Sequence, residues 1–315
     1  MEILTIIHSR KIEYIPIIYE FADKAESHIL FYDHADKQYA VEIKASIEQF
    51  QEKKGFISKI EMIEVDEDSK NDMQKITQRF RNDNPNLYLN GAGADTALFT
   101  VLSSIVLSHH GKVIAYDKED NSYNLIAQNG FTSQKIQKSM KIEDFVMLMG
   151  DELLEEVAQE KILKREDALE LLFSDAKQMF KVRHLLKINK KIELKGRYLD
   201  ILKALKDLDI VDKNYKLRGQ DGFVRFGYLF EDFVYLQLIK FAFDDVKVGV
   251  KIRFDKQQVE NQNIEVSNEF DILVIKENKI GFVECKLGDS LEPLHTIYKS
   301  DSIWIILVKI VPVLL

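Results

Sequence analysis

Short apolar runs alternate with amphipathic segments along the first half of the chain. The runs have the length of strands, and the segments between the first five carry apolar residues at the period of a helix. The predicted strands are residues 3–7, 28–32, 59–65, 86–90, 112–116 and 122–126. Because helical crossovers join parallel strands, residues 1–150 are expected to form a Rossmann-like α/β domain, closed by a hairpin that turns at 118–121.

Residues 151–220 are charge-rich and follow a helical period instead. Apolar side chains such as Leu153, Leu154 and Val157 recur at the spacing of a helix with a modest apolar face. The segment is therefore expected to be a helical linker without a catalytic grouping. Its small basic run at 187–191 is interpreted as an exposed loop or as a phosphate contact.

Residues 221–315 form a third segment. Residues 223–243 are aromatic and apolar nearly all round, which predicts a buried helix. Strands are expected at 245–254, 269–275 and 279–287, the last two joined in a hairpin. The whole chain is therefore assigned to the α/β class, with a Rossmann-like N-terminal domain, a helical linker and a C-terminal α/β core.

Composition narrows the picture further. The chain has 315 residues, 46% of them hydrophobic and 30% charged, which is typical of a soluble globular protein of at least two domains. A single cysteine, Cys285, excludes an intramolecular disulfide and agrees with a reducing cytoplasm. The formal charge of −8 argues against a chain that binds nucleic acid over its whole surface, so any polyanion must be held locally.

The sequence gives no signal for a membrane segment. The N-terminus is interpreted as a buried strand rather than a signal peptide. The apolar tail 302–315 is shorter than the roughly 20 residues a membrane helix needs, and it carries Lys309 and Pro312.

The candidate chemistry lies in the C-terminal hairpin. Asp271 falls in one predicted strand, and Glu284 and Lys286 alternate with Cys285 in the next. Because side chains alternate across a strand, Glu284 and Lys286 share a face, to which Asp271 can contribute from its neighbour. Two carboxylates so close favour a divalent cation, and oxygen ligands suit Mg²⁺ or Mn²⁺. The arrangement predicts hydrolysis of a phosphodiester, with Lys286 orienting water or stabilising the transition state.

The Glu-x-Lys pattern by itself has little specificity. It also occurs at Glu42, Glu52, Glu193 and Glu277, and the alternative at Glu284 is a solvated strand end with a surface ion pair. What distinguishes Glu284 is its place at the end of an apolar strand that follows another apolar strand carrying an aspartate. An aspartate in such a run is costly to bury without a partner or a metal.

The order of these motifs resembles the PD-(D/E)xK restriction-endonuclease-like core. The resemblance rests on G-x-x-F-E at 227–231, F-D-I-L at 270–273 and F-V-E-C-K at 282–286, with Phe270 where that family often has proline. It implies that Asp271 and Glu284 bind the metal, that Lys286 is catalytic and that Glu231 adds an outer or second-metal ligand. Glu269 is a further candidate contact, and His295 is expected to be a surface residue.

A glycine-bearing loop follows the fourth predicted strand. Gly91 and Gly93 would let the backbone approach an anion, and the free N–H groups near Asp95 and Thr96 at the start of the next helix would favour a phosphate. The loop lacks the G-K-[ST] of a P-loop and the pattern of a first-turn dinucleotide site. A plain βα turn remains the alternative.

Taken together, these parts resemble CRISPR-associated CARF-domain effector nucleases of type III immunity, which cyclic oligoadenylate activates. The resemblance implies a homodimer that binds cyclic tetra-adenylate and cleaves single-stranded DNA or RNA. The residues it assigns to the ligand are His8, Ser9, Arg10, Asn90, Gly91, Gly93, Asp95 and Thr96. Ala92, Ala94 and Asp95 depart from the family's loop, which leaves the ligand's ring size open, together with its degradation by this domain.

Two alternatives stay open at the level of function. One is an unregulated restriction or repair DNA nuclease with an accessory α/β domain, and the other is a cyclic-nucleotide-sensing regulator with an inactive nuclease unit. The segment after Lys286 departs from the nuclease pattern, which normally continues through a helix into a further strand and helix. A shortened core, from an altered frame or a stop near Ser302, is one expectation, and a last strand formed by the tail is the other.

Overall fold

The computed structural model describes residues 1–8, 13–66, 69–80, 82–93, 97–188, 192, 194–219, 222–259, 262–287 and 304–310. Among the predicted site residues, Ser9, Arg10, Asp95, Thr96 and His295 lie outside this set. The chain divides into two compact units, Met1–Glu152 with Phe254–Val266, and Leu153–Arg253 with Ser267–Leu315. The first unit holds a seven-stranded sheet, and the second holds most of a five-stranded sheet, whose residues 254–266 are grouped with the first unit.

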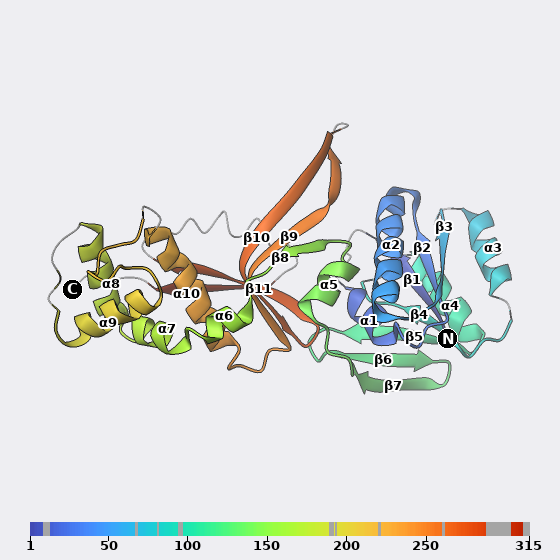
Figure 1. The fold of residues 1–315 in the computed structure, drawn as a ribbon. Coiled ribbons are helices and arrows are strands. Elements are labelled where there is room, and N and C mark those ends of the chain that lie inside the picture. The colour runs from blue at the N-terminus through green and yellow to red at the C-terminus, as the bar shows by residue number, and fades with distance from the viewer. Residues whose placement is uncertain are drawn as a thin grey trace. The chain divides into compact units, whose positions relative to one another are not determined.

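The first unit is a seven-stranded sheet in the order β3-β2-β1-β4-β5-β6-β7 (Figure 1). Neighbouring strands from β3 to β5 are parallel, and β6 and β7 are antiparallel additions. The strands are β1 (Glu2–Ile7), β2 (Ser27–Tyr32), β3 (Lys59–Glu64), β4 (Leu87–Asn90), β5 (Lys112–Asp117), β6 (Ser122–Ala127) and β7 (Gly130–Lys135). The predicted Rossmann-like α/β arrangement is confirmed.

Helices cover both faces of this sheet. They are α1 (Ile15–Phe21), α2 (Lys37–Lys54), α3 (Lys70–Arg79), α4 (Ala97–Ser108) and α5 (Ile142–Leu148), with a 3-10 turn η1 at His34–Asp36. The helices begin and end at residues that commonly cap helices. Pro16 starts α1, the Ser69 hydroxyl caps α3 by accepting from the Asp72 amide, and Gly55 ends α2 in a left-handed conformation.

Strand β7 was not expected from the sequence. Its six residues are all exposed, and their side chains show no apolar alternation. Pairing with β6, from Ala127 opposite Gly130 to Ser122 opposite Lys135, is what makes this segment a strand. The expected hairpin therefore continues into a second one.

The second unit holds a five-stranded sheet in the order β12-β11-β10-β9-β8. The strands are β8 (Glu152–Glu155), β9 (Asp245–Val259), β10 (Gln262–Lys276), β11 (Lys279–Leu287) and β12 (Trp304–Ile310). The helices are α6 (Gln159–Leu163), α7 (Glu166–Phe173), α8 (Ala176–Lys187), α9 (Gly196–Asp207) and α10 (Gly222–Leu238). None of the helices in the described parts of either unit is long and apolar enough to cross a membrane.

The start of the predicted linker is a strand, so the helical prediction for residues 152–155 is wrong. β8 lies at the edge of the sheet beside β9, where the Val157 amide donates to the Val248 carbonyl at 3.1 Å. Leu153 and Leu154 are only half-buried. Pairing with the sheet outweighs the local helical preference here.

The tail supplies a strand beside the candidate site. β12 pairs parallel with β11, from Gly281 opposite Trp304 to Leu287 opposite Ile310. Of the two expectations for this segment, the structure places a last strand there.

Candidate functional site

The β10–β11 hairpin brings the predicted acidic residues together. The strands are antiparallel, and their ladder runs from Lys276 opposite Lys279 to Ile272 opposite Val283, so that Asp271 and Glu284 are the residues directly beyond its last pair and continue its register. Directly opposed residues project from the same face of a sheet. Lys286, two residues after Glu284, projects from that face as well.

Short polar contacts fix these groups. The Lys286 ammonium lies 2.5 Å from Glu284 Oε1, and the Cys285 amide donates to Asp271 Oδ2 at 2.6 Å. The Glu284 side chain is 12% exposed and that of Lys286 is 43% exposed. The carboxylate of Glu284 is thus largely shielded, while the ammonium beside it is open to an incoming anion.

Helix α10 adds Glu231 to this cluster. Burial, followed by the negative charges of Asp271, Asp232 and Glu269, raises the pKa of Glu231 to about 8 against the lowering effect of Lys286. Its neighbour Asp232 has a pKa raised to about 6 by burial, in spite of Arg165 at 3.9 Å. Excess negative charge therefore gathers where α10 meets the hairpin.

Lys286 remains charged in these surroundings. Burial lowers its pKa, but the hydrogen bond to Glu284 and the charges of Glu284, Asp271 and Glu231 outweigh burial, so that the pKa is raised. Burial, followed by the same carboxylates, raises the pKa of the Cys285 thiol. Cys285 is buried and contributes through its backbone amide rather than its sulfur.

The donor set of the hairpin fits a divalent cation. Across the described residues no three His, Cys, Asp or Glu groups stand in a ready metal-binding geometry. The pKa of Glu231 is raised first by burial and then by the charge of Asp271, and a cation beside Asp271 would oppose that second contribution. Carboxylate oxygens are ligands that Mg²⁺ and Mn²⁺ prefer.

A second candidate site lies in the first unit, at the carboxyl ends of β1 and β4. These strands are neighbours, with Thr5 opposite Asn90, and the strand order reverses between them. Open α/β sheets bind ligands at such a switch point. His8 directly follows β1, and Gly91 and Gly93 directly follow β4.

The loop after β4 is shaped by close packing. Gly93 has a φ of +68°, and a Cβ on it would overlap the Glu13 carboxylate and lie 3.0 Å from His8 Nε2. A Cβ on Gly91 would lie 2.9 Å from the Ile114 carbonyl oxygen. Asn90 is buried, and its amide bridges the Tyr14 carbonyl and the Ala92 amide at 3.4 and 3.1 Å. Asn90 thus braces the loop from inside.

The sequence did not single out two acidic residues at this edge. Glu13 approaches Gly93, and Asp36 lies close enough for His8 to lower its pKa, although burial and Asp33 leave that pKa raised. Both are far from the β4 loop along the chain, and no motif spacing marks them. Glu13 follows His8 by five residues, whereas the parallel packing of β1 and β2 brings Asp36 to His8.

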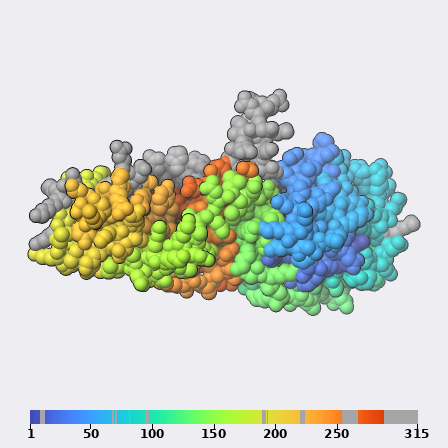
Figure 2. All heavy atoms as spheres, in the orientation of Figure 1, coloured from blue at the N-terminus to red at the C-terminus, as the bar shows by residue number. Residues whose placement is uncertain are grey.

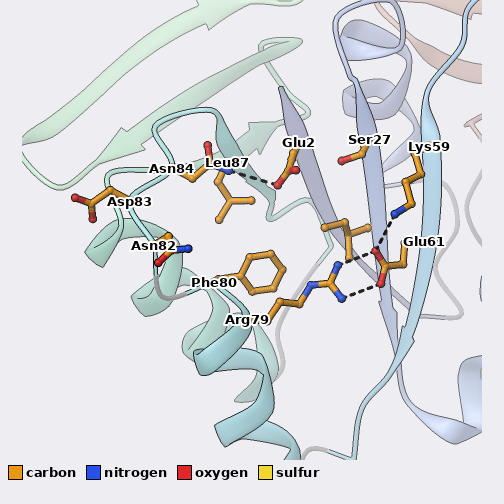
Figure 3. Close-up of a pocket in the computed structure, with 11 residues that line it drawn as sticks. Glu2, Ser27, Lys59, Glu61, Arg79, Phe80, Asn82, Asp83, Asn84 and Leu87 are labelled. Atoms are coloured by element: carbon orange, nitrogen blue, oxygen red, sulfur yellow. Dashed lines mark hydrogen bonds and ion pairs between the residues drawn. The ribbon is translucent and has the colours of Figure 1, made fainter.

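A cavity of the first unit lies at the opposite end of its strands (Figure 3). It has a volume of about 500 Å³ and contains none of the predicted site residues. Its charged groups already pair with one another: Arg79 makes two hydrogen bonds to Glu61, Lys59 lies 4.0 Å from Glu61, and Asn84 donates to Glu2. This pairing leaves little charge for a ligand, so we assign none to it.

Comparison with known proteins identifies the fold. No protein-family model matches the sequence, and no curated protein matches it significantly. Among solved structures, protein VC1899 from Vibrio cholerae is 16% identical, with a TM-score of 0.67, over 98% of this chain and 88% of its own. Can2 from Sulfobacillus thermosulfidooxidans, in complex with cyclic tetra-adenylate, is 16% identical, with a TM-score of 0.67, over 96% of this chain and 82% of its own.

A third structure is a type III CRISPR defence DNA nuclease activated by cyclic oligoadenylate. It is 13% identical, with a TM-score of 0.51, over 99% of this chain and 45% of its own. At such low identity these likenesses establish a shared fold. The resemblance drawn from the sequence is thereby confirmed as a resemblance of fold that extends through both units.

Proposed function

We propose that this protein is a nuclease that cyclic oligoadenylate activates and that cleaves phosphodiester bonds in single-stranded DNA or RNA. The observation that carries the proposal is that Asp271 and Glu284 directly follow the last pair of the β10–β11 ladder on adjacent strands, with Lys286 2.5 Å from Glu284 and with Glu231 in electrostatic contact with Asp271 and Lys286. Acidic pairs with an adjacent ammonium suit phosphodiester hydrolysis. The shared fold with two cyclic-oligoadenylate-linked proteins adds support.

In this proposal the chain's own groups perform distinct tasks. Asp271 and Glu284 would hold Mg²⁺ or Mn²⁺, which when bound supplies positive charge and lowers the pKa of a water molecule. Lys286, half-exposed and protonated, offers its ammonium to the scissile phosphate and stabilises the charge that develops there. Glu231 with a pKa near 8 can hold or release a proton near neutral pH. The Cys285 amide keeps the Asp271 carboxylate oriented.

The activator is proposed to be cyclic tetra-adenylate, bound at the carboxyl ends of β1 and β4. Can2 was solved with this molecule. The predicted contacts that the structure describes, His8, Gly91 and Gly93, gather at this edge, while Asn90 supports the loop. Ser9, Arg10, Asp95 and Thr96 belong to the same two loops in sequence.

We further propose that the protein acts as a homodimer in the cytoplasm. A twofold-symmetric ring suits a site completed by two copies, and a ligand activates only by preferring one arrangement of the protein over another. Activation would then depend on the affinity of the ligand for the competent dimer.

One assay tests the proposal against its alternatives. Labelled single-stranded DNA and RNA are incubated with the protein and Mn²⁺, with and without cyclic tetra-adenylate. Cleavage that requires the ligand is the expected result. Cleavage without it would support the unregulated nuclease, and ligand binding without any cleavage would support the inactive sensor.

A further inference from the structure

Positive charge is concentrated in one stretch of the second unit. Residues 176–225 contain fourteen Lys and Arg against six Asp and Glu, a formal charge of +8 in a chain whose total is −8. The preceding stretch, 151–175, has nine acidic residues against three basic ones. The basic stretch includes α8 and α9.

Helix α8 carries basic side chains on its solvent face, of which Lys177 and Lys181 are like charges. Lys177 and Lys181 are four residues apart, His184 follows three residues later, and all three are exposed. Met179, Val182 and Leu186 occupy the buried side of the same helix. Like charges at this spacing destabilise a helix by about 0.2–0.5 kcal/mol per pair, so this pair is a cost to folding.

These lysines differ from most others that the structure describes. Lysines elsewhere commonly pair with carboxylates, as Lys54 does with Asp144 and Lys240 with Glu170. Within the described part of the chain, Lys177 and Lys181 of α8 have no ion-pair partner, and neither do the exposed Lys203 and Lys206 of α9.

The acidic residues near these helices do not neutralise the lysines of α8. Asp175 caps the start of α8 by accepting from the Gln178 amide, while Asp200 and Asp207 lie one turn from Lys203 on α9. No acidic residue occurs three or four positions from Lys177 or Lys181. The α8 lysines therefore present the stronger positive surface.

The basic helices share a core with the candidate active site. Met179, Leu202 and Leu205 belong to the same hydrophobic cluster as Val283 and Cys285, the two residues on either side of Glu284. The atoms of this helical layer, coloured yellow-green to yellow, lie at the surface in Figure 2. A nucleic acid strand bound to these helices would therefore be bound to the same unit that carries Asp271 and Glu284.

We propose that Lys177 and Lys181, aided by Lys203 and Lys206, bind the phosphate backbone of the single-stranded nucleic acid substrate. The choice of substrate rests on the proposed function, whereas the positive surface does not. Contacts to phosphates are independent of sequence and release counterions, which makes binding depend on salt. Such a surface explains how a chain with a charge of −8 can hold a polyanion locally.

The test measures binding separately from cleavage. The binding measurements use a Glu284→Gln variant. Fluorescence anisotropy gives its affinity for oligo-dT and oligo-U of equal length at salt concentrations from roughly 50 to 200 mM, the range in which phosphate contacts change the affinity strongly. Each lost contact lowers the slope of log K against log salt by about 0.7. Replacing the four lysines with glutamine is expected to reduce the magnitude of that slope by roughly 3, about 0.7 for each of the four, and to weaken binding at low salt at least about tenfold.

A matched control comes from the acidic stretch of the same unit. Lys161→Gln/Lys164→Gln removes two exposed lysines from α6 and its end and is expected to leave affinity and slope unchanged. Equal slopes for the four-lysine variant and its parent, or no salt-dependent binding by the parent, overturn the inference. Wild-type cleavage is assayed in parallel, so that lysine-dependent binding without any cleavage refutes only the proposed function.

Discussion

The backbone amide of Cys285 donates to Asp271 Oδ2 at 2.6 Å across the β10–β11 ladder. The acidic side chain is thus oriented by the neighbouring strand, in a position that alternation along the strand places beside Glu284. A hydrogen bond to the ionised form also favours the charged carboxylate. The orientation of Asp271 does not depend on a bound cation.

Loss of either charged group on β11 is expected to abolish cleavage. Glu284→Ala removes a proposed metal ligand, and Lys286→Ala removes the ammonium proposed to contact the scissile phosphate. Each change should lower the rate of single-strand cleavage by at least about 10²-fold, the usual effect of deleting a transition-state charge contact. Affinity for cyclic tetra-adenylate, measured by calorimetry, should stay the same because that site is proposed in the first unit.

A second Glu-x-Lys pair, outside the candidate site, serves as the control. Glu277 and Lys279 have the same Glu-x-Lys spacing, but Glu277 lies in the turn before β11 with a φ of 53°. Glu277→Ala/Lys279→Ala should cleave like the wild type. Loss of ligand affinity in Glu284→Ala or Lys286→Ala would show that the site has been misplaced.

The stability of the metal-free protein is expected to fall as pH rises through the range set by Glu231. Burial and neighbouring carboxylates raise the pKa of Glu231 to about 8 from its model-compound value of 4.5. Between these pH values the folded state binds more protons than the unfolded state, so its stability declines with pH. Glu231→Gln, which resembles the protonated form, should therefore be more stable than the wild type above pH 8, by up to a few kcal/mol.

Thermal melts in a chelator from pH 5 to 9 check this expectation. The melting temperatures of Glu231→Gln and wild type should separate as pH rises and converge near pH 5. A gap that does not change with pH would show that Glu231 is ionised throughout. Added Mn²⁺ should narrow the gap at high pH, because a cation near Asp271 favours the charged form of Glu231.

Periodicity located most elements because burial follows side-chain alternation. The parallel strands β1 and β2 are apolar runs, which is typical of strands whose sheet is covered by helices on both faces. Strands β7 and β8 lack such runs: the first is fully exposed, and the second is an edge strand. Both depend on pairing with neighbours, which a local pattern does not encode.

The candidate sites also divide into residues that a local sequence pattern reveals and residues that only tertiary packing brings together. Asp271, Glu284 and Lys286 were found because their shared face follows from alternation over two adjacent strands. Glu13 and Asp36 were missed, since tertiary packing is what brings Glu13 to Gly93 and Asp36 to His8. Residues brought together by distant crossovers leave no spacing in the sequence.

Gly93 is expected to be essential for the shape of the ligand loop. Gly93→Ala meets two obstacles, a φ of +68° and overlap with Glu13 and His8. Gly55→Ala is the matched control, since Gly55 has a φ of +75° with nothing within 4 Å of the added Cβ. Both should lose about 1 kcal/mol of stability from backbone strain. Only Gly93→Ala should weaken cyclic tetra-adenylate binding, by calorimetry, and equal affinities for the two variants would contradict this.

The attachment of β8 to the second sheet is expected to depend on Gly249. This residue has a φ of +57°, and a Cβ on it would lie 2.6 Å from Val157 Cγ2. Gly249→Ala should therefore reduce the free energy of unfolding by about 1–3 kcal/mol through backbone strain and overpacking. Val157→Ala removes the Cγ2 atom, so the double variant should recover the part due to overlap and retain the part due to strain. Urea unfolding of the four proteins gives the coupling energy, and strictly additive losses would show that the two residues do not meet.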